Sequence, residues 1–228
     1  MKSLKTLFLV VVAALFATLN LSAQEQELPK SLEIPSAIGD NMVLQQNSTV
    51  NIWGYAKPKS KVSVACDWIA GKPTTVKADA EGVWIVPVAV PAASFDPHTV
   101  TIKSGKQVVT LKNILFGEVW LCAGQSNMEW PVRKTLDMKG QLEGKLNTNI
   151  RLLCTGRISA ETPQRDIPVQ DGKNTKWAVC NAEDLAQFSA VGYGFGKELQ
   201  EALGVPVGLV DASYGGTYIE GWMKREVI

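Results

Sequence analysis

Two different patterns of hydrophobic and polar residues divide the chain. Between about Ile34 and Asn113, short runs alternate apolar and polar side chains, and turn residues separate them. A period of two predicts strands with one buried and one exposed face. Residues 79–82 and 104–106 have the composition of hairpin turns. Short strands at this spacing predict an all-β sandwich domain over residues 24–115.

The pattern changes after Gly117. Residues 118–124 and 205–213 form nearly continuous apolar runs, which are typical of parallel strands buried on both faces. Residues 149–154 are a further candidate strand. Residues 133–145 predict a polar loop or a weak helix. Before the last run, an apolar residue recurs every three or four positions, between a possible N-cap serine and a glycine and proline that would end a helix. These positions are Phe188, Val191, Phe195, Leu199 and Leu203, with Ser189, Gly204 and Pro206 at the ends.

This order of elements predicts an α/β fold with a doubly wound parallel sheet over residues 116–228. Three strands in this span make a narrow sheet, so we expect the sheet to be incomplete at its carboxyl end. Gly192, Gly194 and Gly196 interrupt the helical run and do not have the spacing of a nucleotide-binding loop. We interpret them as positions of close helix packing.

The first 23 residues have the pattern of a secretory signal peptide. Lys2 and Lys5 precede an apolar run over residues 7–19, and Ala23 stands where polar sequence begins. The run is short for a membrane span, although a retained anchor is the alternative. We expect an exported protein, periplasmic or extracellular, with no membrane contact after cleavage.

Charge and cysteine content exclude several classes of function. The chain has 23 basic and 22 acidic side chains and no basic stripe, so nucleic-acid binding has no electrostatic support. None of the four cysteines has metal-ligand spacing, and we predict no metal and no cofactor. Cys66 and Cys122 lie in strand-like runs and are predicted to be buried thiols, while a bridge between Cys154 and Cys180 stays open.

Ser126 is the candidate nucleophile. It follows the apolar run that ends at Ala123, and Gly124 permits a sharp turn there. Ligands of open α/β sheets bind beyond the carboxyl ends of the strands, where a serine can present its hydroxyl and its own N–H to a substrate. Met128 replaces the second glycine of a G-x-S-x-G elbow, which disfavours an ordinary α/β-hydrolase. The alternative is that Ser126 caps a helix and Asn127 forms a turn.

A second strand end carries paired glycines. Ser213, Gly215, Gly216 and Thr217 follow the apolar run 205–213. Paired glycines can simply form a turn. They can also bring backbone N–H groups against a substrate oxygen, so two strand ends would each supply part of one site.

Both segments resemble the sialate O-acetylesterase family of SGNH-type carbohydrate esterases. The likeness rests on GEVWLCAGQSNMEWP and PVGLVDASYGGTYIEGWM, and it extends upstream to IGDNMVLQQNSTVNIWGYAKPKSKVSV. It implies that Ser126 attacks the acetyl group of an O-acetylated sugar, which is the expected partner. It also implies an oxyanion hole formed by the N–H groups of Ser126 and Gly216, or less favourably Gly215. Residues expected to shape or support the substrate cleft are Gln125, Asn127, Glu129, Trp130, Thr217, Glu220 and Trp222.

The family keeps its base in an Asp-x-x-His block that this sequence lacks. His98 is the single histidine, and we expect it to be a surface turn residue at the entrance to a strand. We therefore expect the amino-terminal portion of a longer esterase, with little activity by itself. One alternative is an acetylxylan esterase. Another is a non-catalytic carbohydrate-binding or scaffold module, which a row of Trp53, Trp68 and Trp84 on one sandwich face would favour.

Overall fold

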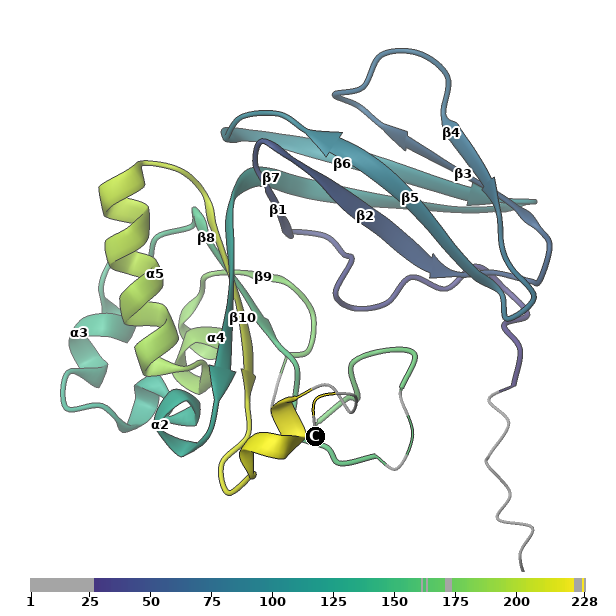
Figure 1. The fold of residues 1–228 in the computed structure, drawn as a ribbon. Helices are drawn as coiled ribbons and strands as arrows, with labels where there is room; N and C mark the ends of the chain where they lie inside the picture. Colours follow the sequence, from purple (N-terminus) through teal and green to yellow (C-terminus); the bar gives the residue numbers. More distant parts are fainter. Residues whose placement is uncertain (1–26, 161, 163, 171–173, 224–226, 228) are drawn as a thin grey trace, which may run out of the picture.

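The computed structural model describes residues 27–160, 162, 164–170, 174–223 and 227 (Figure 1). The predicted signal peptide, residues 1–23, lies outside them. Within the described ranges, no helix has both the length and the apolar character needed to cross a bilayer.

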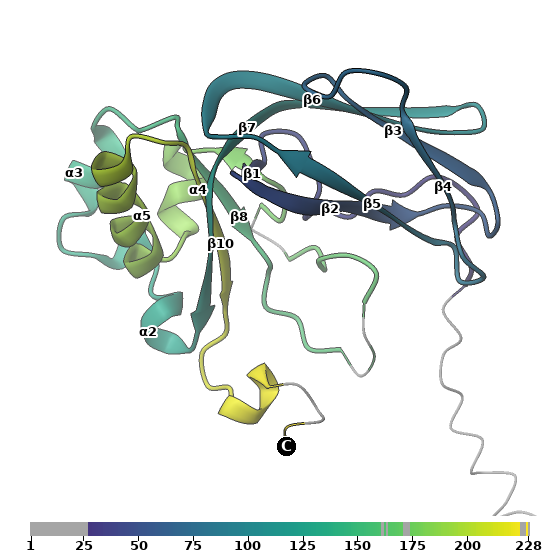
Figure 2. The ribbon, with the colours of Figure 1, turned by 45° about the horizontal axis from the view of Figure 1, so that its top comes forward.

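The first half of the chain consists of strands in two layers (Figures 1 and 2). An antiparallel pair, β2 with β5, faces a sheet in which β4, β3, β6 and β7 follow one another and β1 pairs in parallel with β7. One buried cluster contains Ile52 and Trp84 from the first sheet and Val62 and Val100 from the second. The bounds are β1 (Val43–Gln45), β2 (Ser48–Tyr55), β3 (Lys61–Cys66), β4 (Thr74–Lys77), β5 (Val83–Val90), β6 (Ser94–Ser104) and β7 (Gln107–Gly124).

One of the two predicted hairpins forms. Ser104 pairs with Gln107, which confirms the turn at 104–106. The prediction for 79–82 is wrong, because β4 pairs with β3 and β5 pairs with β2, so this connection crosses between the sheets. The period-two pattern identifies strands but does not say which strands pair.

The row of tryptophans expected for a carbohydrate-binding module is absent. Trp84 is 1% exposed. Trp68 packs edge-on against Phe116, with ring centroids 4.8 Å apart, and donates a hydrogen bond to the Ala89 carbonyl. Trp84 is therefore buried, and the partly buried Trp68 is held against the protein.

The second half forms a mixed sheet with helices. The strand order is β7, β10, β8 and β9, with the first three parallel and β9 antiparallel to β8. The three predicted strands and the long helix are confirmed, and residues 133–145 include a short helix. The bounds are α2 (Ser126–Glu129), η1 (Val132–Lys134), α3 (Met138–Glu143), β8 (Ile150–Cys154), β9 (Ala178–Val179), α4 (Ala182–Gln187), α5 (Ala190–Leu203), β10 (Val207–Ser213) and η2 (Ile219–Trp222).

Helix α5 has the predicted ends but a different buried face. Ser189 accepts a hydrogen bond from the Gly192 N–H at 3.0 Å, and Gly204 ends the helix with φ +63°. Val191 and Phe195, from the apolar stripe, are 54% and 42% exposed. A glycine face packs on the sheet there, which confirms close packing at Gly192 and Gly196. The same prediction is wrong for Gly194, which is exposed and has no atom within 4 Å of its Cβ position.

The two faces of the parallel sheet have different covers. The helices α2, α3, α4 and α5 lie on one side of β7, β10 and β8 in both views (Figures 1 and 2). On the other side, Leu153 and Trp177 join the buried cluster of the strand layers. A doubly wound arrangement, with helices on both faces, is therefore not present in the described part of the chain. The expected domain boundary between residues 115 and 116 falls inside β7, which runs through both halves.

All four cysteines lie in the described ranges, and none of them forms a disulfide. Cys66 and Cys122 are buried, as predicted. The open possibility of a Cys154–Cys180 bridge is excluded. Cys180 forms a side-chain hydrogen bond with Tyr193, and the Cys154 thiol lies 3.9 Å from the Asp211 carboxylate.

Candidate active site

Ser126 begins α2 directly after the carboxyl end of β7 and is exposed. The turn depends on Gly124, whose φ is +153° and where an added Cβ would lie 3.2 Å from the Met128 Cβ. A side chain at this position would be strained and crowded. As the first residue of α2, Ser126 has an N–H with no acceptor inside the helix.

The end of β10 lies beside the end of β7. Ser213 is in register with Gly124, and the Tyr214 N–H donates to the Gly124 carbonyl at 2.9 Å. A Cβ built on Gly215 would lie 3.5 Å from the Ser126 Cα. The serine segment and the glycine segment are therefore in contact. Ser126 and Gly215 are 89 positions apart in the sequence.

The two glycines after β10 have different environments. The Gly215 N–H donates to a carboxylate oxygen of Glu129. Gly216 is exposed, with φ +77° and open space around its Cβ position. Among the described residues, no acceptor binds the Gly216 N–H, so this donor is available to a ligand.

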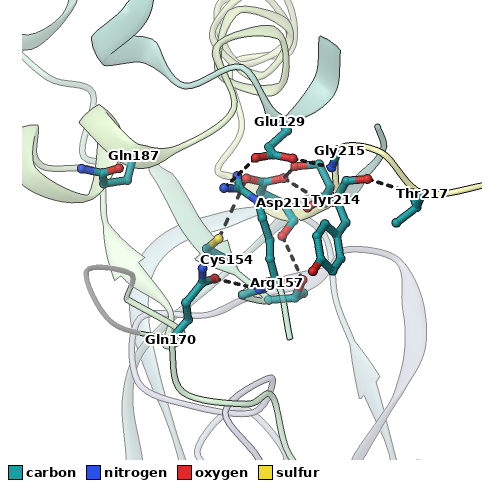
Figure 3. A network of polar contacts seen from close by, with 12 residues as sticks. Glu129, Cys154, Arg157, Gln170, Gln187, Asp211, Tyr214, Gly215 and Thr217 are labelled. Carbon is teal, nitrogen blue, oxygen red and sulfur yellow. Dashed lines mark hydrogen bonds and ion pairs between the residues drawn. The ribbon is translucent and has the colours of Figure 1, made fainter. Parts of the chain in front are cut away.

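Glu129 ties three segments together (Figure 3). One carboxylate oxygen accepts from Gly215, and the other lies 2.9 Å from Nη1 of Arg157. Arg157 Nε also donates to the Ser213 carbonyl at 3.3 Å. The side chains of Glu129 and Arg157 are only 27% and 18% exposed, so the ion pair between them is partly shielded from water. Both carboxylate oxygens of this predicted cleft residue are thus engaged by protein groups.

A buried carboxylate lies beneath the site. Asp211 is 1% exposed and accepts from both the N–H and the hydroxyl of Ser213. Burial, together with the negative charge of Asp211, raises the pKa of the Cys122 thiol to about 11. An acidic residue inside an apolar strand is a visible sequence signal that could have identified Asp211. Arg157 stands in a polar loop, where no spacing distinguishes it.

The remaining predicted cleft residues divide into two groups. The Gln125 side-chain amide donates to the Thr217 carbonyl, and the Trp222 indole donates to the Thr217 hydroxyl at 2.9 Å. Trp130 points elsewhere: its indole donates to the Lys134 carbonyl at 3.3 Å. The structure therefore brings Gln125 and Thr217 together with Ser126, while Trp130 packs toward η1. Asn127 and Glu220 are exposed near this edge.

His98 lies far from Ser126. It is part of β6 rather than a surface turn, its Nδ1 is 2.9 Å from Asp67, and its ring stacks on Phe116 at 4.2 Å. Phe116 and Gly124 belong to the same strand, so at about 3.3 Å per residue the histidine is roughly 25 Å from the nucleophile. The expectation of a turn residue was wrong, but the position excludes His98 from the site.

Cavities open along the carboxyl edge of the sheet, one of them lined by Thr217, Tyr218, Glu220 and Gly221. Another of about 210 Å³ lies between the segments that follow β8 and β10, and Tyr214 and Trp222 line it. Another of about 520 Å³ lies between the end of β8 and α4. The described residues contain no group of three metal-ligating side chains.

A family model and curated relatives both match this chain, and both are sialic acid acetylesterases. Residues 116–228 match the family model described as carbohydrate esterase, sialic acid-specific acetylesterase. Human sialate O-acetylesterase is 33% identical over 202 residues, which are 82% of this chain and 38% of the human protein. The mouse enzyme is 33% identical over 208 residues, 85% of this chain and 38% of its own length.

A solved structure agrees with the sequence relatives. A carbohydrate acetylesterase from Xanthomonas citri superposes with a TM-score of 0.75 and 31% identity, over 86% of this chain and 43% of that one. The chain spans about two fifths of the length of the human and mouse sialate O-acetylesterases.

Proposed function

Because residues 116–228 belong to the sialic acid-specific acetylesterase family of carbohydrate esterases, we propose that this chain supplies the nucleophile and the oxyanion hole for hydrolysis of acetyl esters on sugars. The single observation that supports this most directly is the contact between the two strand ends. The Cβ position of Gly215 lies 3.5 Å from the Ser126 Cα, with the serine exposed.

In this mechanism, the Ser126 hydroxyl attacks the acetyl carbonyl. The N–H groups of Ser126 and Gly216 donate to the oxygen that becomes negative, and the sugar alcohol leaves. Water then hydrolyses the acetyl-enzyme. Gly216 is assigned in preference to Gly215 because Glu129 already accepts from the Gly215 N–H. Each such donor contributes on the order of a hundred- to a thousandfold in rate.

The base is the missing part of this mechanism. The sequence has one histidine, and it is bound to Asp67, far from Ser126. We propose that full activity requires an Asp-x-x-His block on further polypeptide. By analogy with serine hydrolases that lack triad members, turnover without it falls on the order of a millionfold.

O-acetylated sialic acid and acetylated xylan are the two candidate substrate classes. The position of the acetyl group on the sugar is not assigned for either one. Export is the proposed location, because the first 23 residues have the sequence pattern of a signal peptide. The carbohydrate-binding alternative has lost its expected tryptophan row, since Trp84 is buried.

Chemical rescue tests the proposal. Imidazole carries the functional group of histidine, so it should raise hydrolysis of an O-acetylated sugar by the unmodified chain. The rise should saturate with imidazole concentration and disappear in Ser126→Ala. His98→Ala is the matched control and should keep the rescue, because this histidine is not the base.

Two results would contradict the proposal. Equal imidazole-dependent rates in the unmodified chain and in Ser126→Ala would exclude the serine as nucleophile. If the unmodified chain without imidazole turns over as fast as a full-length homologue, the proposal that it lacks a catalytic base is wrong. Mass spectrometry of the peptide that contains Ser126 would identify the acetyl adduct.

A further inference from the structure

A carboxylate lies beside the proposed oxyanion hole. One oxygen of Glu129 is 2.7 Å from the Cβ position built on Gly215, and that position is 3.5 Å from the Ser126 Cα. The carboxylate oxygen is therefore within about 6 Å of the Ser126 Cα. Ester hydrolysis at Ser126 would develop a second negative charge, on the acetyl oxygen, in the same region. The two negative charges would repel each other.

The carboxylate also holds the glycine turn. It accepts from the Gly215 N–H, and Gly215 precedes Gly216, whose N–H is the proposed oxyanion donor. Glycine has the widest conformational freedom of any residue, so a bond that fixes this turn orients the donor that follows. Glu129 therefore positions the turn and at the same time places a negative charge beside the reacting oxygen.

Arg157 supplies the opposite charge (Figure 3). Its Nη1 lies 2.9 Å from Glu129, and its Nε donates to the Ser213 carbonyl at 3.3 Å. Its backbone N–H donates to the Gln170 side chain at 2.7 Å. These bonds hold the guanidinium against the carboxylate, and water screens a partly shielded pair of this kind less than an exposed one.

The size of the repulsion is large enough to matter for catalysis. Two unit charges about 6 Å apart near a protein surface interact strongly enough to change a rate on the order of a hundredfold. One oxyanion-hole donor contributes a similar factor. A carboxylate without its cation would therefore cancel roughly one donor, whereas the ion pair has no net charge.

We propose that Arg157 is a positioning residue for ester hydrolysis: it balances the charge of Glu129, so that this carboxylate can hold Gly215 beside the nucleophile without opposing the oxyanion. The inference rests on the proposed function and deepens it, because it assigns a role to a residue of the loop after β8 that contacts neither the nucleophile nor the acetyl group.

Variants that change the net charge of this pair test the inference. Arg157→Gln leaves a net negative charge, Glu129→Gln leaves a net positive charge, and the double variant has none. Glutamine can still donate at the first position and accept at the second. The probes are acetate, an anion, and acetamide, its neutral counterpart.

The Gly216 amide reports binding without requiring turnover. Gly216 is the only glycine in the sequence that directly follows another glycine. Protein labelled with ¹³C and ¹⁵N in glycine alone therefore gives a single correlation between consecutive glycines. Acetate should shift this resonance in a saturable way.

Acetate affinity should follow the charge of the pair. Arg157→Gln should weaken acetate binding about tenfold or more, Glu129→Gln should strengthen it, and the double variant should return it to the unmodified value. Acetamide binding should change little. Arg165→Gln is the matched control, because Arg165 carries the same charge but lies over the Tyr55 ring of β2, 5.4 Å from its centroid. It should leave acetate affinity unchanged.

Imidazole-rescued hydrolysis of a neutral O-acetylated sugar should show the same dependence. Arg157→Gln should lower kcat on the order of a hundredfold with little change in KM, because the repulsion acts on the charge that develops in the transition state. Adding Glu129→Gln to this variant should recover most of the loss.

A purely structural role predicts a different pattern. Every variant would then bind acetate and acetamide more weakly, and the double variant would be no better than Arg157→Gln. Either result would overturn the inference, as would unchanged acetate affinity in Arg157→Gln or no saturable shift by acetate. If Arg157→Gln does not fold, Glu129→Gln still decides, because it must bind acetate more tightly.

The kinetic results separate this inference from the proposed function. Rescue that depends on Ser126 but is unaffected by Arg157→Gln would reject only the role of Arg157. Absence of rescue in the unmodified chain would reject the proposed function, and the role of Arg157 in hydrolysis with it.

Discussion

Glu129 is the residue on which the geometry beside Ser126 depends most. Its carboxylate holds the Gly215 N–H and pairs with Arg157, which in turn donates to the Ser213 carbonyl. The nucleophile helix, the glycine segment and the segment after β8 are therefore joined through one side chain. A loss here leaves a donor and a guanidinium without their acceptor.

Replacing Glu129 should loosen this junction. We expect Glu129→Ala to lower the free energy of unfolding by about 1–3 kcal/mol, because a partly buried N–H and a partly buried cation lose their acceptor. Glu129→Gln should cost less, since an amide oxygen can still accept from Gly215. Urea unfolding measures both.

A double-mutant cycle with Arg157→Met supplies the control. If the two side chains act together, the losses in Glu129→Ala and Arg157→Met should not add. If the losses add, or if the free energy of unfolding of Glu129→Ala is unchanged, the interaction between Glu129 and Arg157 does not contribute to stability.

At the level of elements, α5 packs on the sheet through glycines as well as through part of its apolar stripe, because Leu199 packs in the buried cluster and Phe195 contacts Trp120 of β7. An added Cβ would lie 2.5 Å from a methyl of Leu209 at Gly196 and 2.9 Å from the Cys122 sulfur at Gly192. Leu209 is fully buried, so it has little room to move. The missing side chains bring the helix close to β10.

Two glycines of the same helix should respond in opposite directions. Gly196→Ala should lower the free energy of unfolding by about 1–3 kcal/mol through overpacking. Gly194→Ala should raise it by about 0.5–1 kcal/mol, because its Cβ position has no neighbour within 4 Å and alanine favours helix. Thermal or urea unfolding of both variants measures this, and equal effects would contradict the packing described.

At the level of the whole molecule, the two halves share the strand β7 and one of two buried clusters, while a second cluster that includes Ile150 and Leu209 lies in the carboxyl half. Leu153 and Trp177 pack with the residues of the strand layers. Gly117 of β7 lies against Pro206, where a Cβ would come 1.9 Å from the Pro206 carbonyl oxygen. We therefore expect the halves to unfold together.

Arg151 of β8 is an unusual residue at the boundary between the two halves, where its Nη2 lies 3.4 Å from Oδ1 of Asn113 in β7. It is 5% exposed, burial lowers its pKa, and within the described residues its Nε and Nη1 have no acceptor. We expect Arg151→Met to raise the free energy of unfolding by about 1 kcal/mol or more, because an apolar side chain avoids the desolvation cost. A loss of stability in urea unfolding would show that the guanidinium has a partner.

Alkaline pH should destabilise the fold. Burial is the main cause that raises the pKa of the thiols of Cys66, Cys122 and Cys180 from 9.0 to about 11. The unfolded chain thus loses these protons first, so stability is constant below about pH 9 and falls between about pH 9 and 11. Urea unfolding across this range measures the slope, and Cys66→Ala should reduce it. A flat profile would contradict the assigned burial.

The hydrophobic pattern alone located the strands, the long helix with both of its ends, and the two polar segments that meet at the site. These features are local, because period, caps and turn residues act within a few positions. Which segments pair and which groups become partners depended on the tertiary structure. Strand pairing across the turn at 79–82, the glycine face of α5, and the roles of Arg157 and Asp211 were decided by contacts between residues distant in sequence. Such contacts form only when packing brings the segments together, and one linear pattern is compatible with several packings.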